Sequence, residues 1–257
     1  IIFYNKGMRF VVFILVFFIA VKSYAWPPSY KAINLKITVL GEIVWKVPNK
    51  FITMHEQKRK TEFVQWILPI IERQNNIIEQ QRNILLRIKK RQELGIELRP
   101  ETEEFLAKMQ LIYGGNSLSD LLRRVNTIPV ALVIAQASLE SGWGSSRFAQ
   151  QGNNLFGIRT YNKKDIGIKP KNNLKANFKV KAYRTVDDSI ADYLLLLNSH
   201  HAYNDLRIVR AYMTITNRTD VHALADTLFD YSELGSQYIE MVHQHITTIE
   251  RILNEIQ

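Results

Sequence analysis

Residues 131–149 read ALVIAQASLESGWGSSRFA, in which Glu140 and Arg147 are the only charged side chains. Just before this run, residues 126–129 (NTIP) supply polar capping candidates and a proline suited to the first turn of a helix. Gly142 predicts the end of the helix, because glycine readily adopts the left-handed conformation that terminates helices. The sequence therefore predicts an apolar helix ending near Ser141, with Glu140 in its last turn.

Glu140 has the setting of a proton donor. The negative end of the helix dipole and apolar neighbours such as Ile134 and Trp143 both oppose a second negative charge. We therefore expect its pKa to lie above the usual range, which lets the carboxyl group protonate a leaving oxygen as a general acid. The alternative is a solvated helix-end residue that pairs with Arg147.

The surrounding chain is also mostly helical by pattern. Apolar residues recur at three- and four-residue steps from Thr61 to about residue 88, and Pro69 should kink or split this segment. Further helices are expected at 101–112, at 117–125, from a capping box at Thr185 to about Asn198, at 220–230 and at 235–254. One strand is expected at 37–44, and glycine-rich residues 153–184 read as a loop-and-hairpin region.

The amino-terminal residues predict export. Residues 10–21 (FVVFILVFFIAV) are apolar, follow Lys6 and Arg9, and precede Ser23-Tyr24-Ala25 with its small residues. This layout is typical of a signal peptide cleaved after Ala25, which gives a periplasmic or secreted protein; the alternative is an uncleaved membrane anchor. We expect four segments: the signal peptide (1–25), an extended lead-in (26–57), a helical extension (58–115) and the main domain (116–257).

Composition narrows the chemistry further. The 257 residues include no cysteine, which excludes disulfides, thiolate metal sites and a cysteine nucleophile. The histidines lack an acidic ligand set at metal spacing, so we expect no metal and no cofactor. The net charge of +10 favours an anionic partner, and export argues against nucleic acid, which leaves a membrane surface or an anionic polymer such as a cell wall.

Two motifs at fixed spacing resemble the signature of a known enzyme family. The segment IAQASLESGWGSSRFA followed by GNNLFGI (152–158) resembles the signature of glycoside hydrolase family 73, the endo-β-N-acetylglucosaminidases that cut bacterial cell-wall glycan. Within that family the chain most resembles the Bax-like branch. Supporting segments are LPII (68–71), YRTVDDSI (183–190), NSHHAYNDLR (198–207) and YSELGSQY (231–238).

The resemblance implies a fold and a site. The fold would be mainly α (α+β) and lysozyme-like, with two lobes, a small β-hairpin lobe and an amino-terminal helical extension. Glu140 matches the general acid of the family. The implied substrate-binding residues are Trp143, Asn153, Asn154, Phe156 and Tyr203. Aromatic faces that stack on sugars and amides that bind hydroxyl and acetamido groups suit this role, although core packing would also explain the aromatic side chains.

The sequence departs from the family pattern at the second carboxylate. Where relatives often carry a glutamate in the β-lobe, this chain has Lys179. Three interpretations follow: Asp165 supplies the carboxylate, the 2-acetamido group of the substrate acts as nucleophile, or the protein has lost activity. Asp187 and Asp188 are poor candidates, because the capping box already explains an acid there.

These observations predict an exported monomeric glycoside hydrolase that cleaves β-1,4 N-acetylglucosaminyl bonds in peptidoglycan glycan strands, with membrane contact only through the signal segment. The alternatives are a lytic transglycosylase with a single catalytic glutamate and a non-catalytic protein that binds cell-wall glycan.

Overall fold

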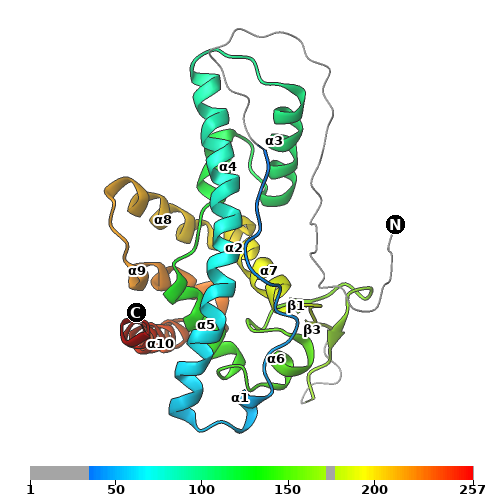
Figure 1. Cartoon of the computed structure of the whole chain (residues 1–257), viewed down its shortest axis with the longest axis vertical. Helices are drawn as coiled ribbons and strands as arrows, with labels where there is room; N and C mark the ends of the chain where they lie inside the picture. The colour runs from blue at the N-terminus through cyan, green and yellow to red at the C-terminus, as the bar shows by residue number, and fades with distance from the viewer. Residues whose placement is uncertain (1–34, 172–176, 257) are drawn as a thin grey trace.

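A computed structural model of the chain describes residues 35–171 and 177–256. Its longest element is helix α2 (Glu56–Glu93), which crosses in front of the other helices in Figure 1. Short helix α1 (Lys50–Thr53) precedes it, and α3 (Pro100–Tyr113) and α4 (Leu118–Arg124) follow. The predicted signal peptide at 1–25 lies outside the described residues. No described helix is long and apolar enough to cross a membrane.

Helix α2 continues through Pro69, so the predicted split does not occur. A proline inside a helix costs about 3 kcal/mol, because it removes a backbone hydrogen bond and crowds the preceding turn. Ile67, Ile70 and Ile71 flank it and are fully buried. Burial of an isoleucine side chain contributes about 1.5–3 kcal/mol. Packing on both sides therefore offsets the cost of the proline.

The centre of the core is α5 (Val130–Ser141), which packs between α2 and α10 (Ser236–Ile256). Residues 131–138 of α5 are all buried, as their apolar composition predicts. The remaining helical elements are α6 (Arg147–Gly152), α7 (Val186–Ser199), η1 (His201–Tyr203), α8 (Asn204–Thr216), α9 (Val221–Ala225) and η2 (Asp226–Tyr231). Helices α6 and α8 lie where no helix was predicted.

A small antiparallel sheet occupies the region predicted as loop and hairpin. Its strands are β1 (Arg159–Thr160), β2 (Gly167–Ile168) and β3 (Lys179–Lys181), in the order β1-β3-β2. Arg159 pairs with Val180 and Thr160 with Lys179, while Gly167 pairs with Lys181. The predicted mainly helical, lysozyme-like fold class with a small β-lobe is confirmed.

The strand predicted at 37–44 is wrong. This segment is extended but joins no sheet, because side chains and a helix start satisfy its backbone groups instead of another strand. The backbone N–H and C=O of Thr38 bond to the Gln80 side chain, both at 2.7 Å. The Val44 N–H donates to Asp187 Oδ2 at 2.8 Å, and the Val44 carbonyl accepts from the Val186 N–H at 2.8 Å.

Asp187 is also the partner of a buried arginine. Arg73 Nη2 lies 2.6 Å from Asp187 Oδ1 and its Nε donates to the same oxygen at 2.8 Å, with both side chains more than nine-tenths buried. One carboxylate therefore connects the lead-in, α2 and α7. Asp188 closes the predicted capping box with Thr185 at 3.0 Å, so both acids have structural roles.

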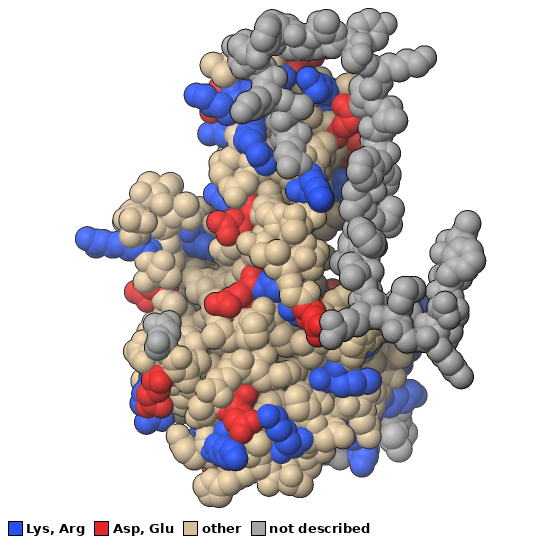
Figure 2. All heavy atoms as spheres, viewed as in Figure 1, with Lys and Arg blue, Asp and Glu red and all other residues tan. Residues whose placement is uncertain are grey.

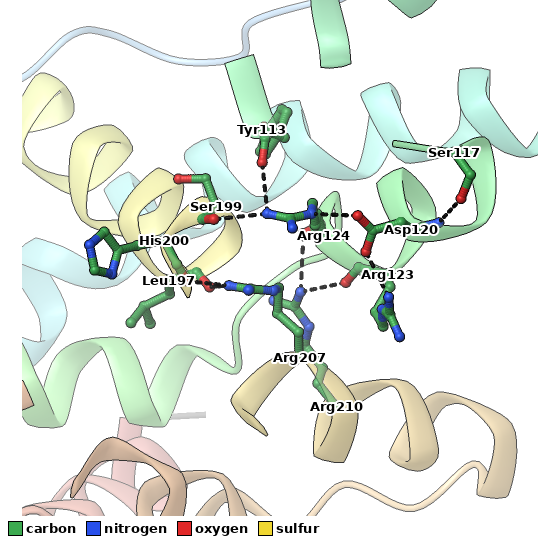
Figure 3. A network of polar contacts seen from close by, with 10 residues as sticks. All are labelled: Tyr113, Ser117, Asp120, Arg123, Arg124, Leu197, Ser199, His200, Arg207 and Arg210. Carbon is green, nitrogen blue, oxygen red and sulfur yellow. Dashed lines mark hydrogen bonds and ion pairs between the residues drawn. The ribbon is translucent and has the colours of Figure 1, made fainter. Parts of the chain in front are cut away.

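A second polar network fixes the helices around α8 (Figure 3). The guanidinium groups of Arg124, Arg207 and Arg210 donate to carbonyl groups at the carboxyl ends of α3, α4 and α7. The acceptors are the carbonyls of Tyr113, Arg123, Arg124, Leu197, Ser199 and His200. Helix carboxyl ends carry partial negative charge, which explains why these arginines lie inside the protein. Burial lowers the pKa of Arg210 to about 9, so it remains charged at neutral pH.

Candidate active site

Glu140 lies in the last turn of α5, as predicted, and the chain then turns sharply. Gly142, Trp143 and Gly144 all have positive φ angles, of 56°, 57° and 76°. A Cβ atom on Gly144 would lie 2.9 Å from the Phe51 ring, so only glycine fits beneath that aromatic side chain. Tight packing of this turn fixes the end of α5 and hence the position of Glu140.

The segment after α6 covers Glu140 from the other side. A Cβ atom on Gly157 would lie 3.2 Å from Glu140 Oε2, and the φ angle of Gly157 is +68°. Glycine at 157 therefore allows the backbone before β1 to approach the carboxyl group closely.

Burial raises the pKa of Glu140 above its ordinary value. A hydrogen bond from Tyr238 and the positive charge of Arg159 act in the opposite direction and lower this pKa, but the effect of burial is larger. The direction agrees with the sequence-based expectation. The alternative partner, Arg147, donates instead to the Lys169 carbonyl at 2.8 Å.

A chain of hydrogen bonds leads to Glu140 through buried side chains. The Tyr193 hydroxyl donates to Gln136 Oε1. Gln136 Nε2 donates to the Tyr238 hydroxyl at 2.9 Å, which leaves the Tyr238 proton for Glu140. Each member of such a chain polarises the next. Gln136 was not among the predicted site residues, although a polar side chain one helical turn before Glu140 on an apolar helix indicates a role beside it.

Aromatic rings pack around this chain. Tyr231 stacks on Tyr238, with ring centroids 5.5 Å apart, and its hydroxyl donates to the Phe156 carbonyl at 2.9 Å. Phe156 stacks on Tyr193 at 3.9 Å, and Tyr203 lies 6.1 Å from Tyr231. Phe156 and Tyr203 are both buried. Their contacts place them in the wall that surrounds Glu140; contact with a substrate stays a prediction for both.

Asn153 and Asn154 hold backbone rather than facing solvent. The Asn153 amide donates to the carbonyls of Trp45, Tyr183 and Arg184 at 3.1–3.3 Å, and its oxygen accepts from the Val47 N–H. The Asn154 amide donates to the carbonyls of Ile158 and Lys181, and its oxygen accepts from two backbone N–H groups. These bonds account for both buried amides without a ligand, so glycan binding by either remains only a prediction.

Trp143 is buried, with 8% of its surface exposed. Its ring stacks on His245 at 5.3 Å and meets the Phe63 ring edge-on at 5.9 Å. Trp143 therefore anchors the turn after Glu140 to α2 and α10. Packing alone explains a tryptophan at this position. That Trp143 also binds glycan stays a prediction.

Asp165 lies in the turn between β1 and β2. Its Oδ2 accepts a hydrogen bond from the Thr160 hydroxyl at 2.6 Å, and its backbone carbonyl accepts from Lys179 Nζ. Lys179 also donates to the Lys163 carbonyl at 3.2 Å. Lys179 thus holds the turn that carries Asp165. A catalytic role for Asp165 stays a prediction.

The histidines separate into different environments. His243 bonds to Asp226 at 2.8 Å and to His222 at 2.5 Å, whereas His245 contacts Ser138 at 2.7 Å. Within residues 35–171 and 177–256, no three histidine, aspartate or glutamate side chains are grouped so that they could hold a metal ion.

Comparison of the amino-acid sequence with known proteins identifies the family of this chain. The family model described as mannosyl-glycoprotein endo-beta-N-acetylglucosaminidase matches residues 115–251. The chain is 30% identical to protein bax of Escherichia coli (strain K12) over 188 residues, which cover 70% of this chain and 66% of that protein. It is 28% identical to exo-glucosaminidase LytG of Bacillus subtilis (strain 168) over 117 residues, covering 42% of this chain and 41% of that protein. No solved structure matches.

Proposed function

The chain belongs to the Bax-like glucosaminidase-domain family, and we propose that it cleaves the β-1,4 bond that follows N-acetylglucosamine in peptidoglycan, with Glu140 as general acid. The observation that carries this proposal is the raised pKa of Glu140, caused by burial at the end of an apolar helix. A carboxyl group that keeps its proton at higher pH can give it to a glycosidic oxygen.

In the proposed reaction, the proton of Glu140 passes to the glycosidic oxygen as the bond to the anomeric carbon breaks. The Tyr238 hydrogen bond stabilises the carboxylate left behind, and the nearby charge of Arg159 acts in the same sense. The resulting carboxylate regains a proton from solvent before the next reaction cycle. The protein thus supplies an acid that is protonated before bond cleavage and stabilised after it.

The group that attacks the anomeric carbon is either a water activated by Asp165 or the acetamido oxygen of the substrate itself. Asp165→Asn separates the two routes. Activation by Asp165 predicts a loss of at least about 100-fold in kcat, since general base catalysis contributes about 10²–10⁴-fold. Attack by the acetamido oxygen predicts a change of less than about threefold, and an oligosaccharide without acetamido groups would then not be cleaved.

The protein would meet its substrate outside the cytoplasm. This proposal rests on the signal-peptide layout of residues 1–25. Sequencing the amino terminus of the exported protein tests it: a mature chain that begins at Trp26 supports cleavage after Ala25, and an intact terminus supports the anchor.

Digestion of purified peptidoglycan tests the activity. Mass spectrometry should find new reducing N-acetylglucosamine ends with the wild-type protein and none with Glu140→Gln. Glu79→Gln is the control, because it neutralises an exposed carboxylate on α2. Anhydro ends would identify a lytic transglycosylase instead, and binding without any new ends would identify a non-catalytic glycan-binding protein.

A further inference from the structure

One face of the small sheet carries two aromatic rings and an arginine. Arg159 pairs with Val180 and Thr160 with Lys179, so the next residues along, Tyr161 and Phe178, lie opposite each other. Alternate residues of a strand share a face, and so do cross-strand partners. Arg159, Tyr161 and Phe178 therefore lie on one face, which we term the aromatic face.

Contacts within the aromatic face hold it together. The guanidinium carbon of Arg159 lies 4.5 Å from the centre of the Phe178 ring. The ring centroids of Phe178 and Tyr161 are 6.0 Å apart, with a 56° angle between the ring planes. The arginine therefore stacks on one ring, and the second ring continues the surface.

The aromatic face is reachable by a ligand, unlike the aromatic residues that the family resemblance indicated. Tyr161 is 65% exposed, and the Arg159 side chain is 49% exposed. Trp143, Phe156 and Tyr203 are all buried. A sugar can stack its apolar C–H face only on a ring that it can touch.

The aromatic face begins beside Glu140. Arg159 follows Gly157, whose backbone approaches the Glu140 carboxyl group, by two residues. Its charge acts on Glu140, where it offsets a part of the rise in pKa that burial causes. A sugar lying along β1 would therefore run from the general acid toward Tyr161.

The existing partner of Arg159 is weakly held. Arg159 Nη1 lies 3.7 Å from Glu233 Oε1, and the Glu233 side chain is 92% exposed. Ion pairs of this kind contribute little in water, so a ligand carboxylate can replace Glu233. An arginine fork binds carboxylates with two parallel hydrogen bonds.

Neighbouring charges on the sheet also favour an anion. Between Arg159 and Lys181 the described basic side chains are Lys163, Lys164, Lys169, Lys171 and Lys179, against the single acid Asp165. Lys and Arg side chains show at the lower right of Figure 2, where the sheet lies in Figure 1. Clustered charge of one sign raises the local concentration of ligands of the opposite sign.

We propose that Arg159, Tyr161 and Phe178 form a subsite for an acid-bearing sugar of the glycan, with the rings stacking on the sugar and the guanidinium binding its carboxylate. This inference rests on the proposed function and goes beyond it by naming the residues that recognise the acid-bearing sugar. The carboxylate that they bind belongs to a lactyl ether group on the sugar or to a peptide attached there. No residue of this subsite was among the predicted binding residues.

Binding of an acid-bearing sugar at this subsite would change the pKa of Glu140. A carboxylate paired with Arg159 neutralises the charge that lowers the pKa of Glu140. Glu140 then holds its proton more firmly once the correct sugar is bound. An acid-bearing glycan is therefore cleaved up to a higher pH than a neutral one.

Soluble glycan strands stripped of peptide, with their lactyl carboxylates free, provide the first test, and the same strands converted to methylamides provide the comparison. Arg159→Gln removes a charge that acts on Glu140 with either substrate, so the two strands are compared: it should lower kcat/KM on the free acid at least tenfold more than on the methylamide. Lys89→Gln is the control, because it removes the same charge from an exposed position on α2 rather than on the sheet, and it should change both values less than twofold. Equal losses of Arg159→Gln on both strands would overturn the role of the carboxylate.

A second substrate identifies the source of the carboxylate. It is a strand that keeps its attached peptides and whose remaining free lactyl groups are converted to methylamides. A tenfold loss for Arg159→Gln on these strands assigns it to the peptide, and a loss confined to the stripped strands assigns it to the lactyl group. Sensitivity on neither substrate would contradict the inference.

Binding measurements separate this inference from the proposed function. In the Glu140→Gln protein, calorimetry should show at least tenfold weaker binding of the free acid when Arg159→Gln is added, and unchanged binding when Lys89→Gln is added. Tyr161→Ala should weaken binding of free acid and methylamide alike, by at least fivefold. If wild-type protein cleaves no glycan but these differences hold, the proposed hydrolase is wrong and the subsite stands; if cleavage occurs without these differences, the subsite is wrong.

Discussion

Gly157 lies so close to Glu140 that a Cβ atom added to it would be 3.2 Å from Glu140 Oε2. The contact joins the backbone leading into β1 to the carboxyl group at the end of α5. Tyr231 supports the same backbone through its hydrogen bond to the Phe156 carbonyl. The geometry of the candidate acid therefore depends on a residue without a side chain.

Gly157→Ala should damage activity more than stability. A left-handed backbone costs about 1–2 kcal/mol for a non-glycine residue, and the new methyl group would also displace the Glu140 carboxyl group. We expect at least a tenfold loss of kcat/KM on peptidoglycan strands, because small displacements of a catalytic group are costly. Gly95→Ala is the matched control: its φ is +66° and nothing lies within 4 Å of the added Cβ. It should lose similar stability in urea and no activity; equal activity losses in both variants would contradict the contact.

Tyr238→Phe should extend activity to higher pH. The Tyr238 hydrogen bond stabilises the carboxylate and lowers the pKa of Glu140, so its removal raises that pKa further. A general acid works only when protonated, so the alkaline limb of the pH profile of kcat/KM should move upward. Tyr212→Phe, at an exposed tyrosine on α8, should leave the profile unchanged. A shift of the limb to lower pH would contradict the assigned hydrogen bond.

Glu140→Gln should stabilise the protein at alkaline pH. Because burial raises the pKa of Glu140 in the folded state, its contribution to stability is complete below its ordinary value of 4.5 and is lost as the pH rises through the folded value. Glutamine carries no charge at any of these pH values. The difference in free energy of unfolding between variant and wild type, measured with urea, should therefore grow from pH 4 to pH 8. A difference that shrinks over this range would mean that the folded protein favours the carboxylate.

Arg73→Met should destabilise the fold strongly. It leaves the Asp187 carboxylate buried without its partner, and breaking a buried ion pair in this way costs about 3–5 kcal/mol. Lys89→Met breaks the exposed pair between Lys89 and Glu93 on the same helix and should cost less than about 0.5 kcal/mol. Urea unfolding measures both values. A small loss for Arg73→Met would mean that water or another group takes over the role of the arginine.

Sequence patterns predicted the elements that local interactions determine. Thr185 and Asp188 form the capping box that begins α7, and Gly142 ends α5 in the left-handed conformation. Apolar periodicity identified α2, but the split expected as one outcome at Pro69 does not occur, because packing against other helices offsets the cost of the proline. The prediction of a strand at 37–44 was wrong for a similar reason: distant parts of the chain decide the structure there. The backbone partners of this segment lie on α2 and α7.

Residue type was a weaker guide to the site. Asn153 and Asn154 have the chemistry to bind a sugar, but the same amide groups also bind backbone, and only the fold decides between the two. Aromatic residues were equally ambiguous: Trp143 packs inside, while Tyr161, in a region read as loop, is exposed. The position of Glu140 was predictable because helix end, apolar sequence and glycine turn all occur within one short segment.

The Asp187 carboxylate has a consequence for how this protein can be divided. Matching to the family begins at residue 115, but the partners of Asp187 include Arg73 and the backbone of Val44, both upstream. Phe63 from the same upstream region packs on Trp143, next to the candidate acid. A fragment that begins at residue 115 would leave the buried Asp187 carboxylate without Arg73. It would also expose the apolar side chains of α5 that pack against α2. The folded unit of this chain therefore starts at the lead-in, and shorter expression fragments should precipitate.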